Sequence, residues 1–401
     1  MQHKYYFEAV NRTLNDICST SDDCLFGNIP IVLGGDFAQI LPVVRRGNRG
    51  AIVEACLQWS FLWSRFTILS LHENMRVREG EDNQEYANWL HQMSFLPQSQ
   101  GVISLPPFIP VCTTIEVLCT HVFPPALMCT AHQNTSTFTR RAILAIRNDT
   151  VATINQKVLQ DIPGTEQEYF AIDTAESSSN EEDGNMFPVE YLQSLNLASL
   201  PPSKLKLKVG APVILLRNLY PKEGLCNGTR MTITRMQRWC IEVRILDGQF
   251  AGAVKILPRI TLSTTEGELP FILTRKQFPI RLSFAMTVNK AQGQSLDVVG
   301  IDLREPAFTH GQLYVALSRV TELQGLKVLL LEEHGRTTQN IVYPEVLIQG
   351  ILQFFFIKYL TLPPISCYLL YNIISSIRQF RCQDAAIIAS GSVSVLFVEY
   401  I

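Results

Sequence analysis

The sequence predicts an α/β protein of two or three domains, with a small β-barrel inserted in its second α/β part. Three observations predict this architecture. Apolar strands alternate with amphipathic helices on both sides of the middle region, short alternating strands dominate that middle region, and 401 residues exceed what one hydrophobic core usually serves.

Composition gives little direct information on function. Lys plus Arg is 34 and Asp plus Glu is 36, so the net charge of -2 carries no global signature of nucleic-acid binding. Any such binding would depend on local basic surfaces or on stacking. The ten cysteines form no CxxC pair, which argues against a zinc module. The residues after Met1 are polar, so the sequence does not open with an apolar signal peptide. Free thiols in a reducing intracellular compartment are the expectation.

The first α/β part is predicted to begin with a helix over 5–18 and a buried strand over 29–33 that ends at Gly34-Gly35-Asp36. A further helix is predicted around 86–93. The first helix is predicted from the helical spacing of Phe7, Val10, Leu14 and Ile17, and the later one from Tyr86, Trp89, Leu90 and Met93.

Residues 101–139 contain one acidic or basic side chain, Glu116, and two proline pairs, so a poorly defined connection is predicted there. The second α/β part then begins with a buried strand over 142–146. A helix follows, predicted from the apolar stripe of Val151, Ile154 and Val158.

The acidic, aromatic-free run 176–184 is predicted to be a disordered insertion. Short strands follow at roughly ten-residue spacing, over 204–208, 213–216 and 239–245, which predicts a β-barrel of about 80 residues. After Phe284 the α/β pattern resumes, with a helix around 313–320 and a strand over 326–331.

Residues 359–377 carry no charge and suggest a membrane span. Pro363-Pro364, Asn372 and the lack of a flanking basic cluster argue against a spanning helix, which favours a collapsed apolar tail. No membrane partner is therefore expected.

Four polar blocks follow strands or end helices in these two parts, and each is weak evidence alone. A carboxylate and an amide after a strand can hold a phosphate or a water, although Gly-Asp more often marks a plain turn. A lone arginine is usually a surface charge, but arginine also stabilises transferring phosphoryl groups. Lys, Gln and Gly after a strand suit a backbone close to an anion. The blocks are 32–44, 71–77, 284–296 and 310–320.

In this order the blocks resemble motifs III, IV, V and VI of superfamily-one helicases of the 5′-to-3′ branch. The resemblance is closest to the Pif (petite integration frequency) type, especially those carried by Helitron transposons. It covers 1–95 and 140–347 and rests on GGDFAQILPVV, NMRV, RAILAIRND, GLCNGTR, FAMTVNKAQGQSL and HGQLYVALSRV.

The resemblance implies two RecA-like motor domains, the first incomplete, with an SH3-like β-barrel inserted in the second. The implied parts are a remnant of the first motor over 1–100, the connection 101–139, the second motor over 140–175 and 283–348, the barrel over 200–282, and an apolar tail of unknown role over 349–401.

The resemblance also implies site residues, cofactors and partners. Catalytic roles fall to Gln39, a sensor of the γ-phosphate, to Arg76, an arginine finger, and to Arg319, the motif VI arginine. Nucleotide binding is implied for Gly35, Asp36, Gln292 and Gly293, and coupling to DNA for Thr287, Asn289 and Lys290. The implied activity is an ATP-dependent 5′-to-3′ DNA helicase using ATP and Mg²⁺ on single-stranded or forked DNA. Its implied context is DNA repair, recombination and telomere maintenance in the nucleus, with the mitochondrion as the alternative.

The sequence departs from this family in two places. It contains neither a Gly-Lys dipeptide nor an Asp-Glu dipeptide. The phosphate-binding loop GxxxxGK[ST] and the acidic pair that would hold Mg²⁺ are therefore not in it, which predicts a chain that starts after motif II and does not hydrolyse ATP alone. A catalytically dead, transposon-derived remnant that at most binds DNA is the alternative function, and a membrane-anchored protein is a third hypothesis.

Overall fold

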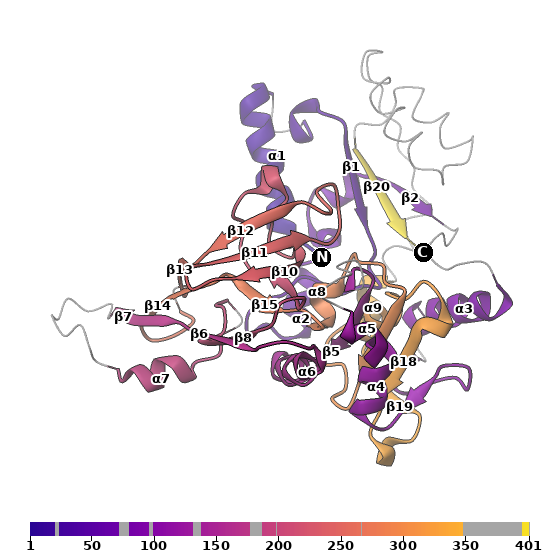
Figure 1. Ribbon diagram of the computed structural model, residues 1–401. Coiled ribbons are helices and arrows are strands. Elements are labelled where there is room, and N and C mark those ends of the chain that lie inside the picture. The colour runs from indigo at the N-terminus through magenta and orange to yellow at the C-terminus, as the bar shows by residue number, and fades with distance from the viewer. Residues whose placement is uncertain are drawn as a thin grey trace. The chain divides into compact units, whose positions relative to one another are not determined.

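The computed structural model describes residues 1–20, 24–71, 80–95, 99–130, 138–176, 187–197, 199–265, 267–347 and 395–400. The chain forms two compact units, each assembled from separate stretches of sequence (Figure 1). Unit 1 combines 1–104, 307–318 and the chain from 338 onward, and unit 2 combines 105–306 and 319–337.

Unit 1 contains helices and short parallel strands. Its helices are α1 (Lys4–Cys18), α2 (Arg49–Glu54), α3 (Glu81–Phe95) and α9 (Gln312–Leu317). Its strands are β1 (Ile31–Gly35), β2 (Thr67–Leu71), β3 (Gly101–Ser104) and β20 (Val395–Tyr400), and β19 (Thr337–Asn340) begins at the boundary with unit 2 and pairs with β3.

The main sheet of unit 1 has the order β1-β20-β2, with both pairings parallel. In Figure 1 the yellow arrow of β20 lies between the two indigo strands. β20 comes from the segment predicted to be an apolar tail of unknown role, of which residues 395–400 form the central strand of this sheet. Residues 348–394, and with them the apolar run 359–377, lie outside the described residues.

Helix α1 confirms the helix predicted over 5–18, and Phe7 and Leu14 of the predicted stripe pack against the core of unit 1, but the other half of the stripe does not. Val10 and Ile17 are exposed, whereas the two fully buried side chains are Asn11 and Asn15. These amides bind the next turn of chain: Asn11 Oδ1 accepts from the Phe26 amide at 2.7 Å, and Asn15 Oδ1 from the Gly27 amide at 2.6 Å. A pattern of apolar residues cannot predict burial of this kind, because hydrogen bonds offset the cost of burying the amides.

Unit 2 is built around an all-parallel sheet of five strands in the order β16-β5-β17-β18-β4. Its strands are β4 (Val111–Cys112), β5 (Arg141–Ala145), β16 (Ala285–Thr287), β17 (Val298–Asp302) and β18 (Leu326–Leu329). The helices of unit 2 are α4 (Ile115–Val122), α5 (Pro125–Cys129), α6 (Asn148–Asp161), α7 (Val189–Ser194) and α8 (Val288–Ala291).

The connection predicted over 101–139 is regular structure in most of its described part. It supplies β3, the edge strand β4, and helices α4 and α5, and the apolar side of α4 is buried in the core of unit 2. Pro125 begins helix α5 and does not interrupt it. It occupies the first turn, where a backbone N–H would have no hydrogen-bond partner within the helix.

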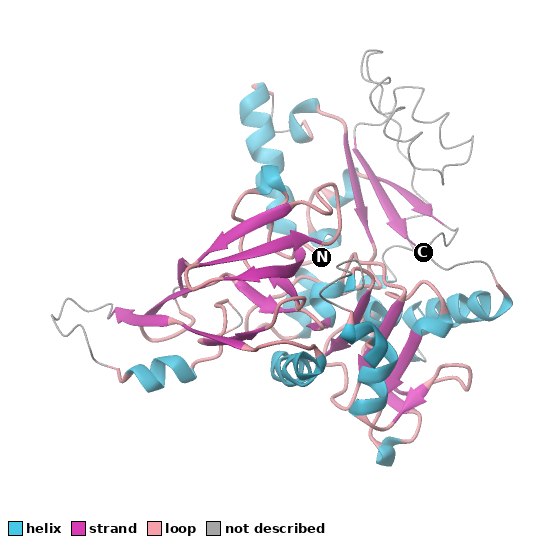
Figure 2. Ribbon diagram, viewed as in Figure 1, coloured by secondary structure: helices cyan, strands magenta, loops and turns pink. Residues whose placement is uncertain are grey.

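The middle of unit 2 is antiparallel, as Figure 2 shows in magenta. Five strands pair in the order β12-β11-β10-β9-β15, and two smaller groups pair as β13-β14-β7 and β6-β8. These strands are β6 (Gln167–Phe170), β7 (Ile172–Glu176), β8 (Lys204–Leu207), β9 (Pro212–Leu215), β10 (Arg230–Met236), β11 (Cys240–Ile245), β12 (Val254–Pro258), β13 (Ile260–Ser263), β14 (Ile272–Gln277) and β15 (Ile280–Leu282).

The predicted boundaries of the inserted part need one correction. The segment 140–175 was assigned to the second motor, but it contains β6 and all of β7 except Glu176. β6 pairs with β8 and β7 pairs with β14, and both partners belong to the antiparallel part. The antiparallel part therefore begins near residue 167, because Gln167 is the first residue paired in it. The acidic run predicted as disordered falls, apart from Glu176, outside the described residues.

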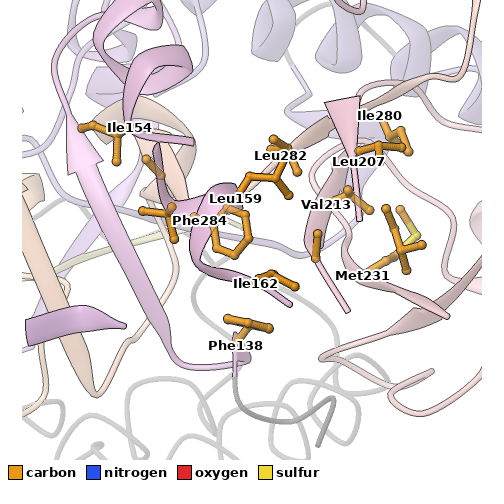
Figure 3. Close-up of a cluster of buried hydrophobic side chains, with 14 of the residues drawn as sticks. Phe138, Ile154, Leu159, Ile162, Leu207, Val213, Met231, Ile280, Leu282 and Phe284 are labelled. Atoms are coloured by element: carbon orange, nitrogen blue, oxygen red, sulfur yellow. The ribbon is translucent and has the colours of Figure 1, made fainter. Parts of the chain in front are cut away.

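One hydrophobic core serves both halves of unit 2 (Figure 3). Ile154 and Leu159 of α6 belong to the same buried cluster as Val213 of β9 and Met231 of β10. Phe284, just before β16, packs edge-on against Phe138 with ring centroids 5.6 Å apart. Because the two halves share this core, the antiparallel part is fixed on the parallel sheet and is not an independent domain on a linker. No described helix is long and apolar enough to cross a membrane.

Candidate functional site

The turn after β1 holds the first predicted site residues in a fixed geometry. The Asp36 carboxylate is buried, and its Oδ1 accepts from the Ala38 amide at 2.9 Å while its Oδ2 accepts from Gln39 Nε2 at 2.8 Å. Gly35 is the last residue of β1. The structure thus joins Asp36 and Gln39 directly, and the carboxylate orients the side-chain amide at the carboxyl edge of the parallel sheet.

His310, just before α9, binds this turn from a distant part of the sequence. Its side chain is 1% exposed, its Nε2 lies 2.7 Å from the Phe37 carbonyl oxygen, and its Nδ1 accepts from the Tyr343 amide at 2.8 Å. The imidazole also stacks on the Tyr343 ring with centroids 5.3 Å apart. One neutral tautomer satisfies both bonds, with Nε2 donating and Nδ1 accepting.

This environment predicts a pH-dependent stability. Burial lowers the pKa of His310 to about 4 from its usual 6.5, and the bond to the Phe37 carbonyl opposes that shift only in part. The stabilisation is therefore complete above pH 6.5, is lost as pH falls from 6.5 to 4, and changes no further below 4. At 1.36 kcal/mol per pKa unit the loss is about 3 kcal/mol.

Urea denaturation at several pH values checks this expectation. His310→Gln should flatten the dependence of unfolding free energy on pH between 4 and 6.5. His334→Gln is the control, because the side chain of His334 is 48% exposed, and it should leave the dependence unchanged. Equal slopes for the wild type and His310→Gln would contradict the assignment.

Gly311 brings α9 against the same turn. It caps the N-terminus of α9 with a φ of +71°, and a Cβ placed on it would lie 2.4 Å from the Ala38 carbonyl oxygen and 2.6 Å from the Gln39 carbonyl carbon. Only glycine permits this approach. The motif III turn and the start of motif VI are therefore one packed element within unit 1.

The remaining predicted residues gather in unit 2, around the end of β16. Thr287 precedes α8 and is buried, Asn289 and Lys290 are exposed on α8, and Gln292 ends that helix. Gly293 follows with a φ of +84° and open space where a Cβ would be. This arrangement presents an amide and a lysine beside a tight turn, as a loop that binds a phosphate requires.

Arg319 lies in the same unit and is fully buried. Its Nη1 donates to the Gln294 carbonyl at 3.2 Å, and its own carbonyl accepts from the Leu296 amide at 2.9 Å. Motif V and the end of motif VI are thereby linked within unit 2. The remaining predicted residue, Arg76, lies outside the described residues.

Two residues of this arrangement were not predicted as site residues. His310 stands in the fourth sequence block but received no role, and Tyr343 lies beyond the quoted motifs. The His-Gly pair at 310–311 was the available signal for His310. A glycine just before a helix indicates a close backbone contact, and the histidine stands next to it.

The described residues do not fit a Mg²⁺–nucleotide site. They contain no cluster of three or more His, Cys, Asp or Glu side chains that could hold a metal ion. Asp36 lies nearest the sheet edge, but its carboxylate already accepts two hydrogen bonds. The sequence also lacks the Gly-Lys and Asp-Glu pairs. The described residues therefore provide neither a loop that could bind the phosphates nor a set of metal ligands.

Comparison with known proteins agrees with the motif resemblance. Residues 1–97 match the family described as PIF1-like helicase, and 190–236 match the 2B domain of DNA helicase Pif1. The human ATP-dependent DNA helicase PIF1 is 32% identical over 315 residues, which cover 76% of this chain and 41% of that protein. The ATP-dependent DNA helicase Pif1 of Bdellovibrio bacteriovorus is 28% identical, with 76% of this chain and 58% of that protein covered. The chain therefore spans about two fifths of the human protein and under three fifths of the bacterial one.

Solved structures agree in fold. The Pif1 helicase of Candida albicans has a TM-score of 0.59 at 20% identity, covering 87% of this chain and 73% of that one. The Bacteroides Pif1 helicase in complex with ADP-AlF3 and ssDNA has a TM-score of 0.58 at 22% identity, covering 88% and 72%. These likenesses confirm the predicted RecA-like α/β motor fold, whereas an SH3-like barrel remains a prediction.

Proposed function

Because this chain is a relative of the PIF1-like helicases over about three quarters of its length, we propose that it forms the DNA-binding and coupling part of an ATP-dependent 5′-to-3′ DNA helicase. The observation that carries the proposal is the junction of motif III with motif VI through His310, Gly311 and the 36–39 turn. A motor needs such a junction, because a conformational change at one loop must be passed on to another element.

The proposed partner is single-stranded or forked DNA. Lys290 and Asn289 are exposed on α8, where a lysine can contact a backbone phosphate without reading base sequence. Thr287, Gln292 and Gly293 hold the turn that presents them. The proposed cellular setting is nuclear genome maintenance, including repair, recombination and telomere maintenance.

The nucleotide side of the proposal depends on groups that this sequence does not contain. Gln39, Arg76 and Arg319 keep their proposed roles toward ATP and Mg²⁺ only together with a phosphate-binding loop. A second candidate function is a catalytically inactive helicase remnant that binds DNA. The two candidates agree on DNA binding and differ on ATP hydrolysis.

A binding experiment tests the shared part. The purified chain should raise the anisotropy of a labelled thymidine oligonucleotide, with an affinity that falls as salt rises. Lys290→Ala should weaken binding and reduce the slope of log affinity against log salt by about 1, the effect of losing one phosphate contact. Lys222→Ala, an exposed lysine elsewhere in unit 2, is the matched control. Failure of the wild type to bind would overturn both candidates.

An ATPase assay with the same oligonucleotide separates the two. The chain alone is expected to show no DNA-stimulated turnover, because loss of preorganised phosphate contacts costs at least about 10²- to 10³-fold in rate. Clear stimulated turnover would exclude the inactive remnant and would contradict this expectation.

A further inference from the structure

The hairpin between β10 and β11 carries an exposed tryptophan between two arginines. Trp239 is 62% exposed at the tip of this hairpin. The Arg238 guanidinium carbon lies 5.0 Å from the centre of its ring and that of Arg259 lies 6.0 Å away. An exposed indole of this size is uncommon on a surface that only faces water, since tryptophan is usually buried in large part.

The hairpin is held rigidly at its base. Tyr169 Oη donates to the Gln237 carbonyl at 3.0 Å, and the Gln237 amide donates to the Cys240 carbonyl at 3.0 Å to close the turn. Arg259 Nη1 donates to the Phe170 carbonyl at 2.7 Å while its guanidinium packs over the rings of Tyr169 and Phe278. Trp239 is therefore presented by a fixed support, which reduces the entropy lost when a ligand binds.

The charge around the indole is positive. In the part of the chain that the structure describes, neither Arg238 nor Arg259 forms an ion pair with a carboxylate. Two guanidinium groups beside one indole thus favour a ligand that combines an aromatic face with negative charge.

A hollow adjoins the base of the hairpin. It has a volume of about 670 Å³ and is lined by Thr234, Arg235 and Met236 of β10, by Val209, and by 163–167. This volume lies within the range of about 300–1,000 Å³ that small-ligand sites occupy.

We propose that Trp239 is a stacking platform for an unpaired base of single-stranded DNA, with Arg238 and Arg259 facing the adjoining phosphates. The proposal rests on the proposed DNA-binding function and places a second contact on the antiparallel part of unit 2, separate in sequence from Lys290. Stacking on an aromatic face tolerates any base, so this contact adds affinity without sequence preference.

Fluorescence anisotropy with a labelled thymidine oligonucleotide tests the platform. Trp239→Ala should weaken binding between about 5-fold and 150-fold, the range for loss of one stacked base. Trp239→Phe should retain most of the affinity, because a ring remains. Arg238→Gln should reduce the salt dependence of log affinity by about 1. Tyr220→Ala is the matched control, being 64% exposed on the connection that precedes β10, and should bind like the wild type.

The outcomes separate this proposal from the proposed function. If the wild type binds and Trp239→Ala binds within twofold of it with an unchanged melting temperature, the platform is refuted while DNA binding stands. If the wild type does not bind, both fall. Intrinsic fluorescence gives a second readout: quenching by unlabelled oligonucleotide should disappear in Trp239→Phe and persist in Trp59→Phe, whose indole is 44% exposed in unit 1.

Discussion

Replacing Arg275 with leucine is expected to cost unit 2 about 3–5 kcal/mol of stability, because it leaves a buried carboxylate without its partner. Arg275 and Asp173 are directly opposite each other on β14 and β7, and both side chains are fully buried. Two bonds of 2.8 Å join them, from Nε to Oδ1 and from Nη2 to Oδ2. The same guanidinium donates to the carbonyls of Leu192 and Pro201 at 3.0 Å each.

A double variant separates the charge from the packing. Chemical denaturation should show that Asp173→Leu combined with Arg275→Leu recovers part of the loss, because no charge is then left buried. Recovery should be incomplete, since the carbonyls of Leu192 and Pro201 still lose their donor. Destabilisation below about 1 kcal/mol in Arg275→Leu alone would show that the pair is dispensable, as exposed pairs often are.

Gly311→Ala is expected to have the second-largest effect and to act at the junction of motifs III and VI. The left-handed backbone at φ +71° costs a non-glycine residue about 1–2 kcal/mol. The new Cβ would also lie 2.4 Å from the Ala38 carbonyl oxygen, and displacing this backbone adds about 1–3 kcal/mol. The 36–39 turn that orients Gln39 would have to move.

Gly248→Ala isolates the conformational part of that cost. Gly248 has a φ of +80°, and a Cβ there meets no atom within 4 Å. Its alanine variant should lose only the conformational contribution when both are measured by urea denaturation. Equal losses for Gly248→Ala and Gly311→Ala would mean that the contact with Ala38 is soft and that the junction is not tightly packed.

The sequence predicted the helices and strands of both units well where the apolar residues recur at a regular helical or strand spacing. The helix at 148–161 and the strands at 31–35 and 141–145 lie where apolar spacing placed them. The connection 101–139 was misread, because proline pairs were taken as breaks although Pro125 starts a helix. The pairing of β6 and β7 with the antiparallel strands depends on contacts far apart in sequence, which no local period contains.

The candidate site was predictable in its residue types but not in its assembly. Asp36 and Gln39 could be named from the block after β1, whereas the bonds of His310 to Phe37 and Tyr343 join three separate stretches of chain. Asn11 and Asn15 were missed for a related reason. Burial of a polar side chain depends on which backbone groups it meets, and those groups come from another element.

The order β1-β20-β2 determines when unit 1 can fold during synthesis. β1 and β2 are neighbours in sequence, yet they do not pair with each other, and each pairs only with residues 395–400, which lie between them. Gly35 and Val395 are 360 positions apart, so on the ribosome β1 and β2 wait with unpaired edges while all of unit 2 is made. The parallel sheet of unit 2, from β4 to β18, can close earlier. Unit 2 should therefore fold first, and nascent unit 1 should depend on chaperones to protect its waiting strands.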